Sequence, residues 1–189
     1  MQLDHVLLAL IRMRPGISGY QLQSIINDST GFFFTVRNSQ IYPALRRLLG
    51  NELATYETVI QDGKPNLKLY KITEEGERKL EEWLLDRFEF RWTRSSYDLY
   101  FLKLILMGHL EPEKIVSYID WGIEMITRDK KRMLEDHLSI ERDFLETDDA
   151  VIRGRFEGIW SNEYSFILKD MTDRIAELET IKDNLLSRA

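Results

Sequence analysis

Apolar side chains recur every three or four residues in three segments of the first fifty residues, and each segment predicts a helix with one buried face. The first helix is expected over about residues 3–13. The second starts at Gly19, with Ser18 as its N-cap, and continues for about two turns. The third starts near Asn38, because the side chain of Asn38 or Ser39 can accept hydrogen bonds from the free amides of a first helical turn.

The third helix has two chemically different faces. The buried face is predicted to consist of Ile41, Ala44, Leu45, Leu48 and Leu49, and the outer face carries Ser39, Gln40, Tyr42, Pro43, Arg46 and Arg47. Proline has no N–H to donate, so Pro43 fits only near the start of a helix. The polar N-terminal half therefore points outward, as in a helix that enters the major groove of DNA. Taken alone, such a segment is more often an ordinary solvated helix face.

A β-hairpin is expected after the third helix. Gly50 and Asn51 tolerate the left-handed conformation and are expected to end that helix. Segments 54–60 and 67–72 are rich in β-forming residues, and a turn rich in hairpin formers separates them. Thr73 is expected to cap a fourth helix. The order helix, helix, helix, hairpin, helix predicts a mainly α protein that begins with a winged helix-turn-helix.

The second half of the chain is expected to be a long-helix dimerisation domain. A long helix begins near Pro112, and a last helix ends near Ser187. The apolar positions of the long helix alternate by four and three, which is a heptad-like stripe. Two such helices joined by a short turn expose more apolar surface than they bury, so a two-fold partner is the simplest way to cover it. We expect a winged-helix domain over residues 1–86 and a helical dimerisation and effector domain over residues 87–189.

Composition narrows the class of protein. Of the 189 residues, 43% are hydrophobic and 11% are aromatic, which is enough to fill a core. The absence of cysteine excludes disulfides, thiolate metal sites and cysteine nucleophiles. No stretch approaches the roughly 20 apolar residues of a membrane span, and the first residues lack the basic region of a signal peptide. We therefore expect a cytoplasmic protein that does not bind membranes.

The net charge of −6 is distributed unevenly along the chain. Residues 12–71 contain eight Lys and Arg and four Asp and Glu, a local charge of +4, whereas residues 86–189 contain 16 basic and 22 acidic side chains. A mildly basic head on an acidic body is compatible with one phosphate-facing surface. The small local charge predicts a modest phosphate-driven affinity per subunit.

The chain lacks the sequence signatures of catalysis. His5, His109 and His137 are scattered and form neither the HxxxH nor the HExxH spacing of a metal site. There is no GxSxG motif, P-loop or GxGxxG motif. Carboxylate pairs lie at predicted helix starts, where the helix dipole accounts for them. We expect no enzyme, no catalytic residue, no bound metal and no cofactor.

Four segments together resemble the PadR family of transcriptional regulators. They are residues 18–22 (SGYQL), 39–48 (SQIYPALRRL), 63–65 (GKP) and 69–76 (LYKITEEG). The resemblance covers about residues 1–85. Downstream, the sequences EWL and DLYFLK are similar to the subfamily with longer C-terminal domains that includes phenolic-acid-responsive regulators and virulence activators. Glu52 departs from the family pattern, which usually has glycine just before the first wing strand, so we expect the end of the third helix to shift slightly.

The resemblance implies a DNA-binding regulator whose C-terminal helices form a homodimer. Two recognition helices about one DNA turn apart would bind an inverted repeat in double-stranded DNA. We expect a repressor that a small, aromatic or lipophilic effector releases. The alternative is a winged-helix module that binds an acidic protein through its arginine-bearing face and does not bind specific DNA sequences.

The candidate DNA contacts have separate expected roles. Ser39, Gln40 and Tyr42 are expected at base edges or the backbone, Arg46 at guanine or phosphate, and Ser18, Tyr20, Lys64 and Lys68 at phosphates. Gln40 is the best candidate for base recognition, because its amide can bond adenine with two hydrogen bonds. Tyr42 has an alternative position inside the core, and the charge of Lys68 has an alternative role as ordinary strand-surface charge.

Aromatic residues after the winged-helix domain are candidates for an effector pocket. The set comprises Trp92, Tyr97, Tyr100 and Trp121, with Phe101 and Trp160 as further members. Such residues could line a pocket for a flat molecule between the winged-helix domain and the dimer arm. Aromatic residues in this number are more often core and subunit contacts than a pocket.

Overall fold

The computed structural model describes residues 2–27, 36–61, 63, 66–145 and 150–187. Contacts between residues divide the chain into two compact units. The first comprises Met1–Phe88 and Tyr97–Glu111, and the second comprises Glu89–Ser96 and Pro112–Ala189. The segment Glu89–Ser96 therefore packs with the second unit, although the chain on both sides of it belongs to the first.

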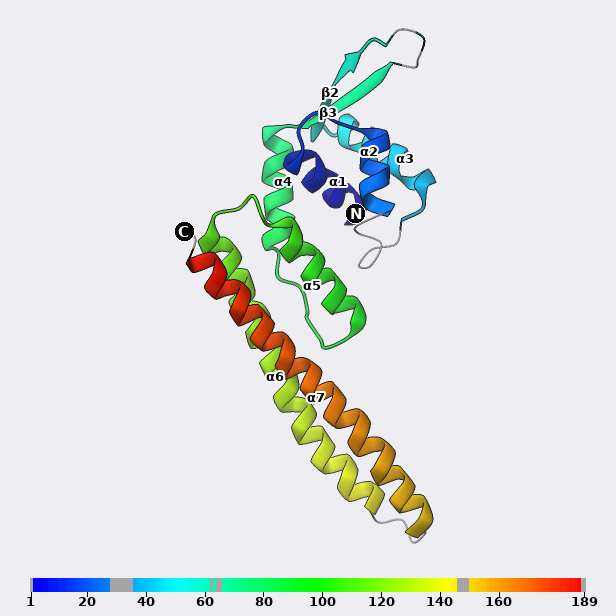
Figure 1. Ribbon diagram of the computed structural model, residues 1–189, viewed down its shortest axis with the longest axis vertical. Coiled ribbons are helices and arrows are strands. Elements are labelled where there is room, and N and C mark those ends of the chain that lie inside the picture. The colour runs from blue at the N-terminus through cyan, green and yellow to red at the C-terminus, as the bar shows by residue number, and fades with distance from the viewer. Residues whose placement is uncertain (1, 28–35, 62, 64–65, 146–149, 188–189) are drawn as a thin grey trace. The chain divides into compact units, whose positions relative to one another are not determined.

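The helices predicted for the first unit are present. They are α1 (Gln2–Met13), α2 (Gly19–Ile25), α3 (Asn38–Gly50) and α4 (Glu74–Leu85) (Figure 1). Helix α1 is the centre of this unit, because it contacts α2, α3, α4 and the last strand of the sheet. All six residues from Val6 to Ile11 are buried. A helix that is covered on most sides needs such a continuous apolar run.

The predicted hairpin is also present, and a short third strand extends it. The sheet contains β1 (Ile17–Ser18), β2 (Ala54–Val59) and β3 (Leu67–Ile72), all antiparallel, in the order β1-β3-β2. In the hairpin Ala54 lies opposite Ile72, and in the short strand Ile17 lies opposite Tyr70. Three helices with this sheet form a winged helix, as the sequence predicts. Strand β1 was not predicted, because a strand of two residues is too short to show an alternation of apolar and polar side chains.

The two helix-turn-helix helices begin with different caps. At α2 the prediction is confirmed: the Ser18 hydroxyl accepts from the Gln21 amide at 3.3 Å, and the Gln21 side chain accepts from the Ser18 amide at 3.0 Å. At α3 the predicted cap is wrong, because the N-cap is Arg37 rather than Asn38 or Ser39. Instead of a cap side chain, Gln40 Oε1 accepts from the Arg37 amide at 3.0 Å.

The end of α3 differs from the prediction in a similar way. Glu52, not Gly50 or Asn51, adopts the left-handed conformation, with φ of 58°. The Leu53 amide donates to the Leu48 carbonyl at 2.9 Å, and the Glu52 amide donates to the Leu49 carbonyl at 3.1 Å. This bonding pattern is a Schellman motif, which normally places glycine at the Glu52 position. The helix end is therefore not shifted; a non-glycine residue takes the left-handed conformation.

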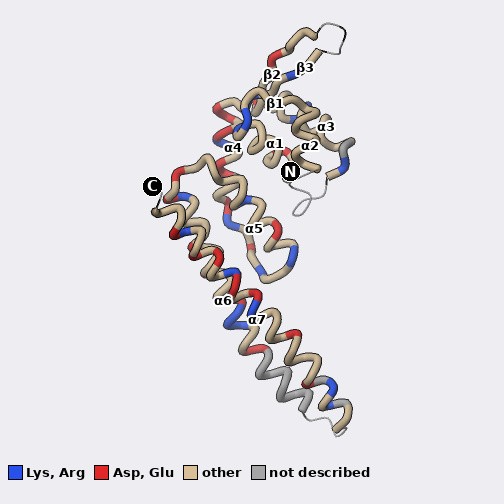
Figure 2. Tube along the Cα trace, in the orientation of Figure 1, with Lys and Arg blue, Asp and Glu red and all other residues tan. Residues whose placement is uncertain are grey.

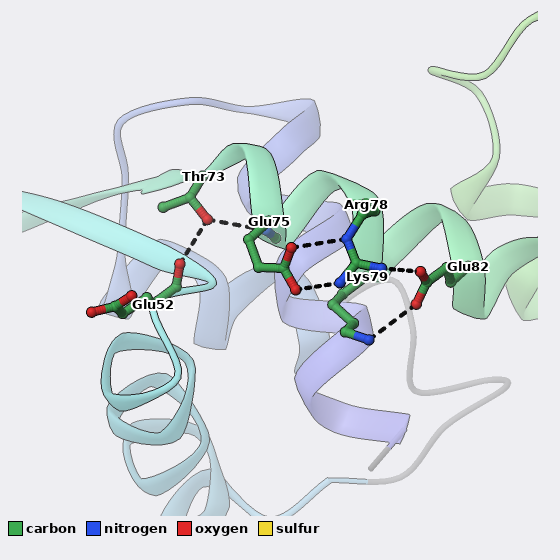
Figure 3. A network of polar contacts seen from close by, with 7 residues as sticks. Glu52, Thr73, Glu75, Arg78, Lys79 and Glu82 are labelled. Atoms are coloured by element: carbon green, nitrogen blue, oxygen red, sulfur yellow. Dashed lines mark hydrogen bonds and ion pairs between the residues drawn. The ribbon is translucent and has the colours of Figure 1, made fainter.

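Helix α4 begins beside this turn (Figure 3). Thr73 caps it as predicted, because its hydroxyl accepts from the Gly76 amide at 3.0 Å, and the same hydroxyl donates to the Glu52 carbonyl at 2.8 Å. A Cβ on Gly76 would lie 2.0 Å from the Leu53 carbonyl oxygen, so only glycine fits. Further along α4, Arg78 bonds Glu75 and Glu82 on the exposed surface.

Helix α5 (Arg94–Leu106) belongs to the first unit from Tyr97 onward, and its buried residues include a lysine. Lys103 is 2% exposed, donates to the Asp86 carbonyl at 2.7 Å and lies 5.1 Å from the centre of the Trp83 ring. Burial lowers the pKa of Lys103 below its ordinary value. Just beyond α5, burial lowers the pKa of His109, and the nearby Arg12 lowers it further, against the opposing effect of acidic residues on α4.

The second unit is a pair of long antiparallel helices, as predicted. They are α6 (Pro112–Leu145) and α7 (Ala150–Leu186). Ile119 and Ile126 of the predicted stripe are buried, and Tyr164, Met171 and Leu178 repeat every seven residues along the buried side of α7. Figure 2 shows acidic and basic residues interspersed along both helices, which is typical of their solvated faces. The division of function between residues 1–86 and residues 87–189 stays a prediction.

Two residues of α6 fasten the segment Glu89–Ser96 within the second unit. The buried carboxylate of Asp129 accepts from the Trp92 amide at 2.7 Å, and Arg128 donates to the Phe90 carbonyl at 2.9 Å. The Phe90 ring also meets the Trp121 ring edge-on, with centroids 6.2 Å apart. Backbone and side-chain contacts thus hold this segment to α6.

Candidate nucleic-acid interface

The outer face of α3 is exposed, as the sequence predicts. Ser39, Gln40 and Arg46 are exposed, and Tyr42 retains 46% of its surface. The core position weighed for Tyr42 is therefore wrong. The apolar face of the same helix is buried, because Ile41, Ala44, Leu45 and Leu48 are each at most 1% exposed. The leucines and isoleucine anchor the helix in the core, and the polar side chains stand away from it.

The exposed face of α3 forms one side of a concave surface. The other sides are formed by α2 and by the β2–β3 hairpin, which is the wing of the winged helix. A hollow of about 360 Å³ lies between them, and its lining includes Tyr20, Tyr42, Arg46, Asn66 and Lys68. These residues carry hydrogen-bond donors, flat rings and positive charge, the groups with which proteins contact phosphates and bases. Four of the predicted DNA contacts are thus brought together from three separate elements.

Tyr42 owes its position to a glycine. A Cβ added to Gly19 would lie 2.9 Å from Cε1 of the Tyr42 ring. The ring therefore lies directly against the start of α2, beside Tyr20, which is 74% exposed. Burial raises the pKa of Tyr70, and the nearby Tyr42 and Tyr56 raise it further, so the Tyr70 phenol stays neutral at neutral pH.

Gln40, which is predicted to contact a base, also caps the start of α3. Its Oε1 accepts from the Arg37 amide, which ties the side chain to the start of α3. An amide oxygen has two lone pairs, and the Nε2 group has two N–H donors. The side chain can therefore keep the cap and still offer donors outward. The hydrogen bond holds the amide at the front of the helix.

The two neighbouring arginines of α3 have different surroundings. Arg47 bonds the carboxylate of Asp4 on α1 through two contacts, Nη2–Oδ1 at 2.5 Å and Nε–Oδ2 at 3.2 Å. The hydrogen bond with Asp4 raises the pKa of Arg47. Arg47 therefore fastens α3 to α1. Arg46 is exposed and lines the concave surface, which makes it the better candidate for DNA contact.

On the wing, Lys68 is exposed and its Nζ lies 4.1 Å from the centre of the Tyr56 ring. The neighbouring Lys71 instead bonds Glu57 at 2.5 Å, which neutralises it locally. Lys64, predicted at the tip, lies outside the described residues. Ser18 is 4% exposed and its hydroxyl serves the α2 cap, so the structure favours capping as its role over phosphate contact.

The structure divides the effector candidates between the two units. Tyr97 and Tyr100 belong to the first, where Tyr100 is fully buried against Phe101. Trp92 and Trp121 belong to the second, where Trp121 is 6% exposed and packs against Tyr118 and Phe90. Of the four, Trp92 lines a cavity of the second unit, together with Trp160.

Neither a metal site nor a membrane span is found among the described residues. No group of three His, Cys, Asp or Glu side chains there could hold a metal ion. Over the same residues, no helix combines the length and apolar character that crossing a membrane requires.

Comparisons with known proteins converge on one family. Residues 7–82 match the model of the transcriptional regulator PadR-like family. Over 83 residues the chain is 35% identical to the negative transcriptional regulator PadR of Bacillus subtilis (strain 168), and these residues are 44% of this chain and 45% of that protein. Over 86 residues it is 34% identical to a probable transcriptional regulator of Mycobacterium tuberculosis (strain ATCC 25618 / H37Rv), covering 46% of this chain and 45% of that protein. The matched region thus spans a little under half the length of each curated relative.

A solved structure is similar over a longer stretch. The crystal structure of Bacillus subtilis PadR in complex with operator DNA aligns with 98% of this chain and 99% of its own, at 20% identity and a TM-score of 0.47.

Proposed function

We propose that this chain is a repressor that binds an inverted-repeat operator as a homodimer, because residues 7–82 match the model of the transcriptional regulator PadR-like family. The family and both curated relatives are transcriptional regulators, in agreement with the expectation of a protein that is not an enzyme. Repression is proposed because one relative is a negative regulator. We also propose a cytoplasmic location, because both curated relatives are regulators from bacteria, whose DNA lies in the cytoplasm.

The observation that carries the proposal is the concave surface of the first unit. Gln40, Tyr42 and Arg46 project from a helix whose opposite face is buried, and Tyr20 and Lys68 flank them from α2 and the wing. A recognition helix needs this combination of a fixed inner face and a polar outer face. We assign base recognition to Gln40 and Arg46 and phosphate contact to Tyr20, Lys68 and Lys64.

Dimerisation is proposed from the second unit. Val151, Ile159 and Phe166 of α7 are between 61% and 70% exposed, at successive spacings of eight and seven residues. That spacing places them along one side of the helix. Exposed apolar side chains in a row are typical of an interface. A second copy of the chain would cover them and would supply the second recognition helix.

Control by an effector is the finer part of the proposal. A crystal structure of Bacillus subtilis PadR in complex with p-coumaric acid exists, and it motivates an effector for this chain. An effector acts only if it binds the DNA-competent and DNA-free arrangements with different affinity. Domains are proposed at residues 1–86 for DNA binding and 87–189 for dimerisation and effector response.

The proposal is tested by fluorescence anisotropy with a labelled random duplex, followed by selection of bound sequences from a random pool. Binding is expected to weaken steeply with salt, and Lys68→Ala is expected to lower the salt slope by about one unit. Thr55→Ala, on the exposed surface of β2, is the matched control and should leave the slope unchanged. Absence of salt-sensitive binding would favour the alternative, a module that binds an acidic protein.

A further inference from the structure

The second unit contains a cavity of about 360 Å³. Its walls are largely apolar and aromatic: Trp92 comes from the segment Glu89–Ser96, Met133 from α6, and Trp160, Tyr164 and Met171 from α7. The volume lies within the range of small-molecule sites, which are mostly apolar with a few polar groups. Indole rings and thioethers pack well against the faces and edges of flat rings.

Hydrogen bonds and ion pairs already engage most polar groups that line this cavity. The Asp129 carboxylate accepts from the Trp92 amide at 2.7 Å and from Arg128 at 3.4 Å. The Arg91 side chain pairs with Glu89 at 2.8 Å. The Tyr164 hydroxyl donates to the Met133 carbonyl at 2.9 Å.

The two remaining charged groups are opposite in sign. Arg132 and Asp136 are exposed, line the cavity and stand four residues apart on α6. Side chains at this spacing are neighbours on one helix face. Together they contribute no net charge, so the lining as a whole favours neither an anion nor a cation. The lining therefore fits an uncharged molecule better than a charged one.

The cavity also contacts the part of the chain that connects the two units. Its wall includes Arg91, Trp92 and Thr93, all within the segment Glu89–Ser96. That segment continues covalently into the first unit at both ends, toward α4 and toward α5. A molecule that packs against Trp92 therefore touches the residues through which the two units are joined. This covalent connection gives a conformational change in the segment a path to the first unit.

We infer that this cavity binds an uncharged, planar aromatic molecule, and that the segment Glu89–Ser96 transmits its binding to the DNA-binding unit. The claim that the cavity binds such a molecule depends only on the residues that line it. The claim of transmission rests on the proposed function, because it requires that the first unit binds DNA.

The site is tested with two dyes that share one ring skeleton, the uncharged N-phenyl-1-naphthylamine and its sulfonated counterpart 1-anilinonaphthalene-8-sulfonate. The uncharged dye is expected to bind the full chain with a rise in fluorescence, at least about tenfold tighter than the sulfonate. Trp160→Ala should weaken binding of the uncharged dye by about tenfold or more, since it removes one aromatic wall. Trp160→Phe keeps a ring and should retain most of the affinity.

The control is Leu186→Ala, on the same helix, because Leu186 is 54% exposed and does not line the cavity. It should leave dye affinity unchanged. Equal losses from Leu186→Ala and Trp160→Ala would overturn the site in favour of dye bound to exposed apolar side chains. Tighter binding of the sulfonate would overturn the ligand class. Dye affinity that falls as protein concentration rises would show a second copy occupying the cavity instead, and would also overturn the site.

Transmission is tested by DNA anisotropy with the selected operator, with and without saturating N-phenyl-1-naphthylamine. A change of at least about threefold in operator Kd, lost in Trp160→Ala, supports it. Dye binding with no change in Kd overturns transmission and leaves the site standing. Failure of the dye-free protein to bind any duplex would instead be a failure of the proposed function, and the fluorescence result would be unaffected by it.

Discussion

Replacing Glu52 by glycine is expected to stabilise the winged-helix unit. A left-handed conformation costs an ordinary residue about 1–2 kcal/mol, and Glu52 adopts it with φ of 58°. Glycine removes that strain but gains freedom in the unfolded chain, which costs about 0.4–1 kcal/mol. The hydrogen bond between its carbonyl and Thr73 belongs to the backbone and is kept. The expected net gain in the free energy of unfolding is about 0.5–1 kcal/mol.

The measurement is urea unfolding followed by circular dichroism at a fixed protein concentration. With an m-value of about 2 kcal/mol/M, the expected midpoint increase for Glu52→Gly is about 0.3–0.5 M. Glu52→Ala is the control, because it removes the carboxylate but keeps the Cβ responsible for the strain. It should give little or no gain. An equal gain from both variants would mean that the carboxylate, not the backbone conformation, destabilises this turn, and a loss from Glu52→Gly would refute the reasoning outright.

Four further substitutions test the packing at three glycines and the pH response. Gly76→Ala should lower the free energy of unfolding by about 2–3 kcal/mol, because the added Cβ overpacks the turn. Gly158→Ala in α7, where an added Cβ meets nothing, should raise it by about 0.5–1 kcal/mol. Similar effects of the two variants in urea unfolding would contradict the close contact between Gly76 and the Leu53 carbonyl. Gly19→Ala should displace the Tyr42 ring and weaken DNA binding several-fold in anisotropy, with little change in stability because the ring is half exposed; undiminished binding would remove Tyr42 from the interface. The pKa of His109 is lowered in the folded state, so the unfolded chain binds its proton more tightly, and the free energy of unfolding falls as pH drops from about 6.5 toward the folded pKa. His109→Gln should reduce the pH dependence of the free energy of unfolding between pH 7 and pH 5. An unchanged pH dependence would show that other groups cause it.

The sequence predicted those elements of the fold that carry a repeated pattern. The helical spacing of Ile41, Leu45 and Leu48 placed α3 to within a residue, and two runs of β-forming residues with a turn-rich segment between them placed the hairpin. Strand β1 escaped prediction because its two residues pair with a strand some fifty positions away. The left-handed Glu52 escaped because its conformation is imposed by the Schellman bonds and Thr73, not by its own preference.

The candidate site was predictable in its residues and less so in its internal contacts. Exposure of Gln40 and Arg46 follows from the amphipathic pattern alone. The pairing of Arg47 with Asp4 does not, because it joins residues 43 positions apart. The effector candidates were chosen for being aromatic, and composition cannot distinguish Trp92, which lines a cavity, from Tyr100, which fills the core.

The central claim is that α3 recognises base sequence through Gln40. The most direct measurement is the ratio of anisotropy Kd values for random duplex and selected operator, for the wild type and for two Gln40 variants. Gln40→Ala is expected to lower the ratio by about tenfold, the value of one two-bonded base contact, with little change in random-duplex affinity. Gln40→Glu keeps the oxygen that caps the Arg37 amide but loses the amide donors, so it should lower the ratio as well. If the ratio falls in Gln40→Ala but keeps its wild-type value in Gln40→Glu, the role of Gln40 is limited to capping the Arg37 amide. If the ratio is unchanged in both variants, base recognition by this helix position is contradicted.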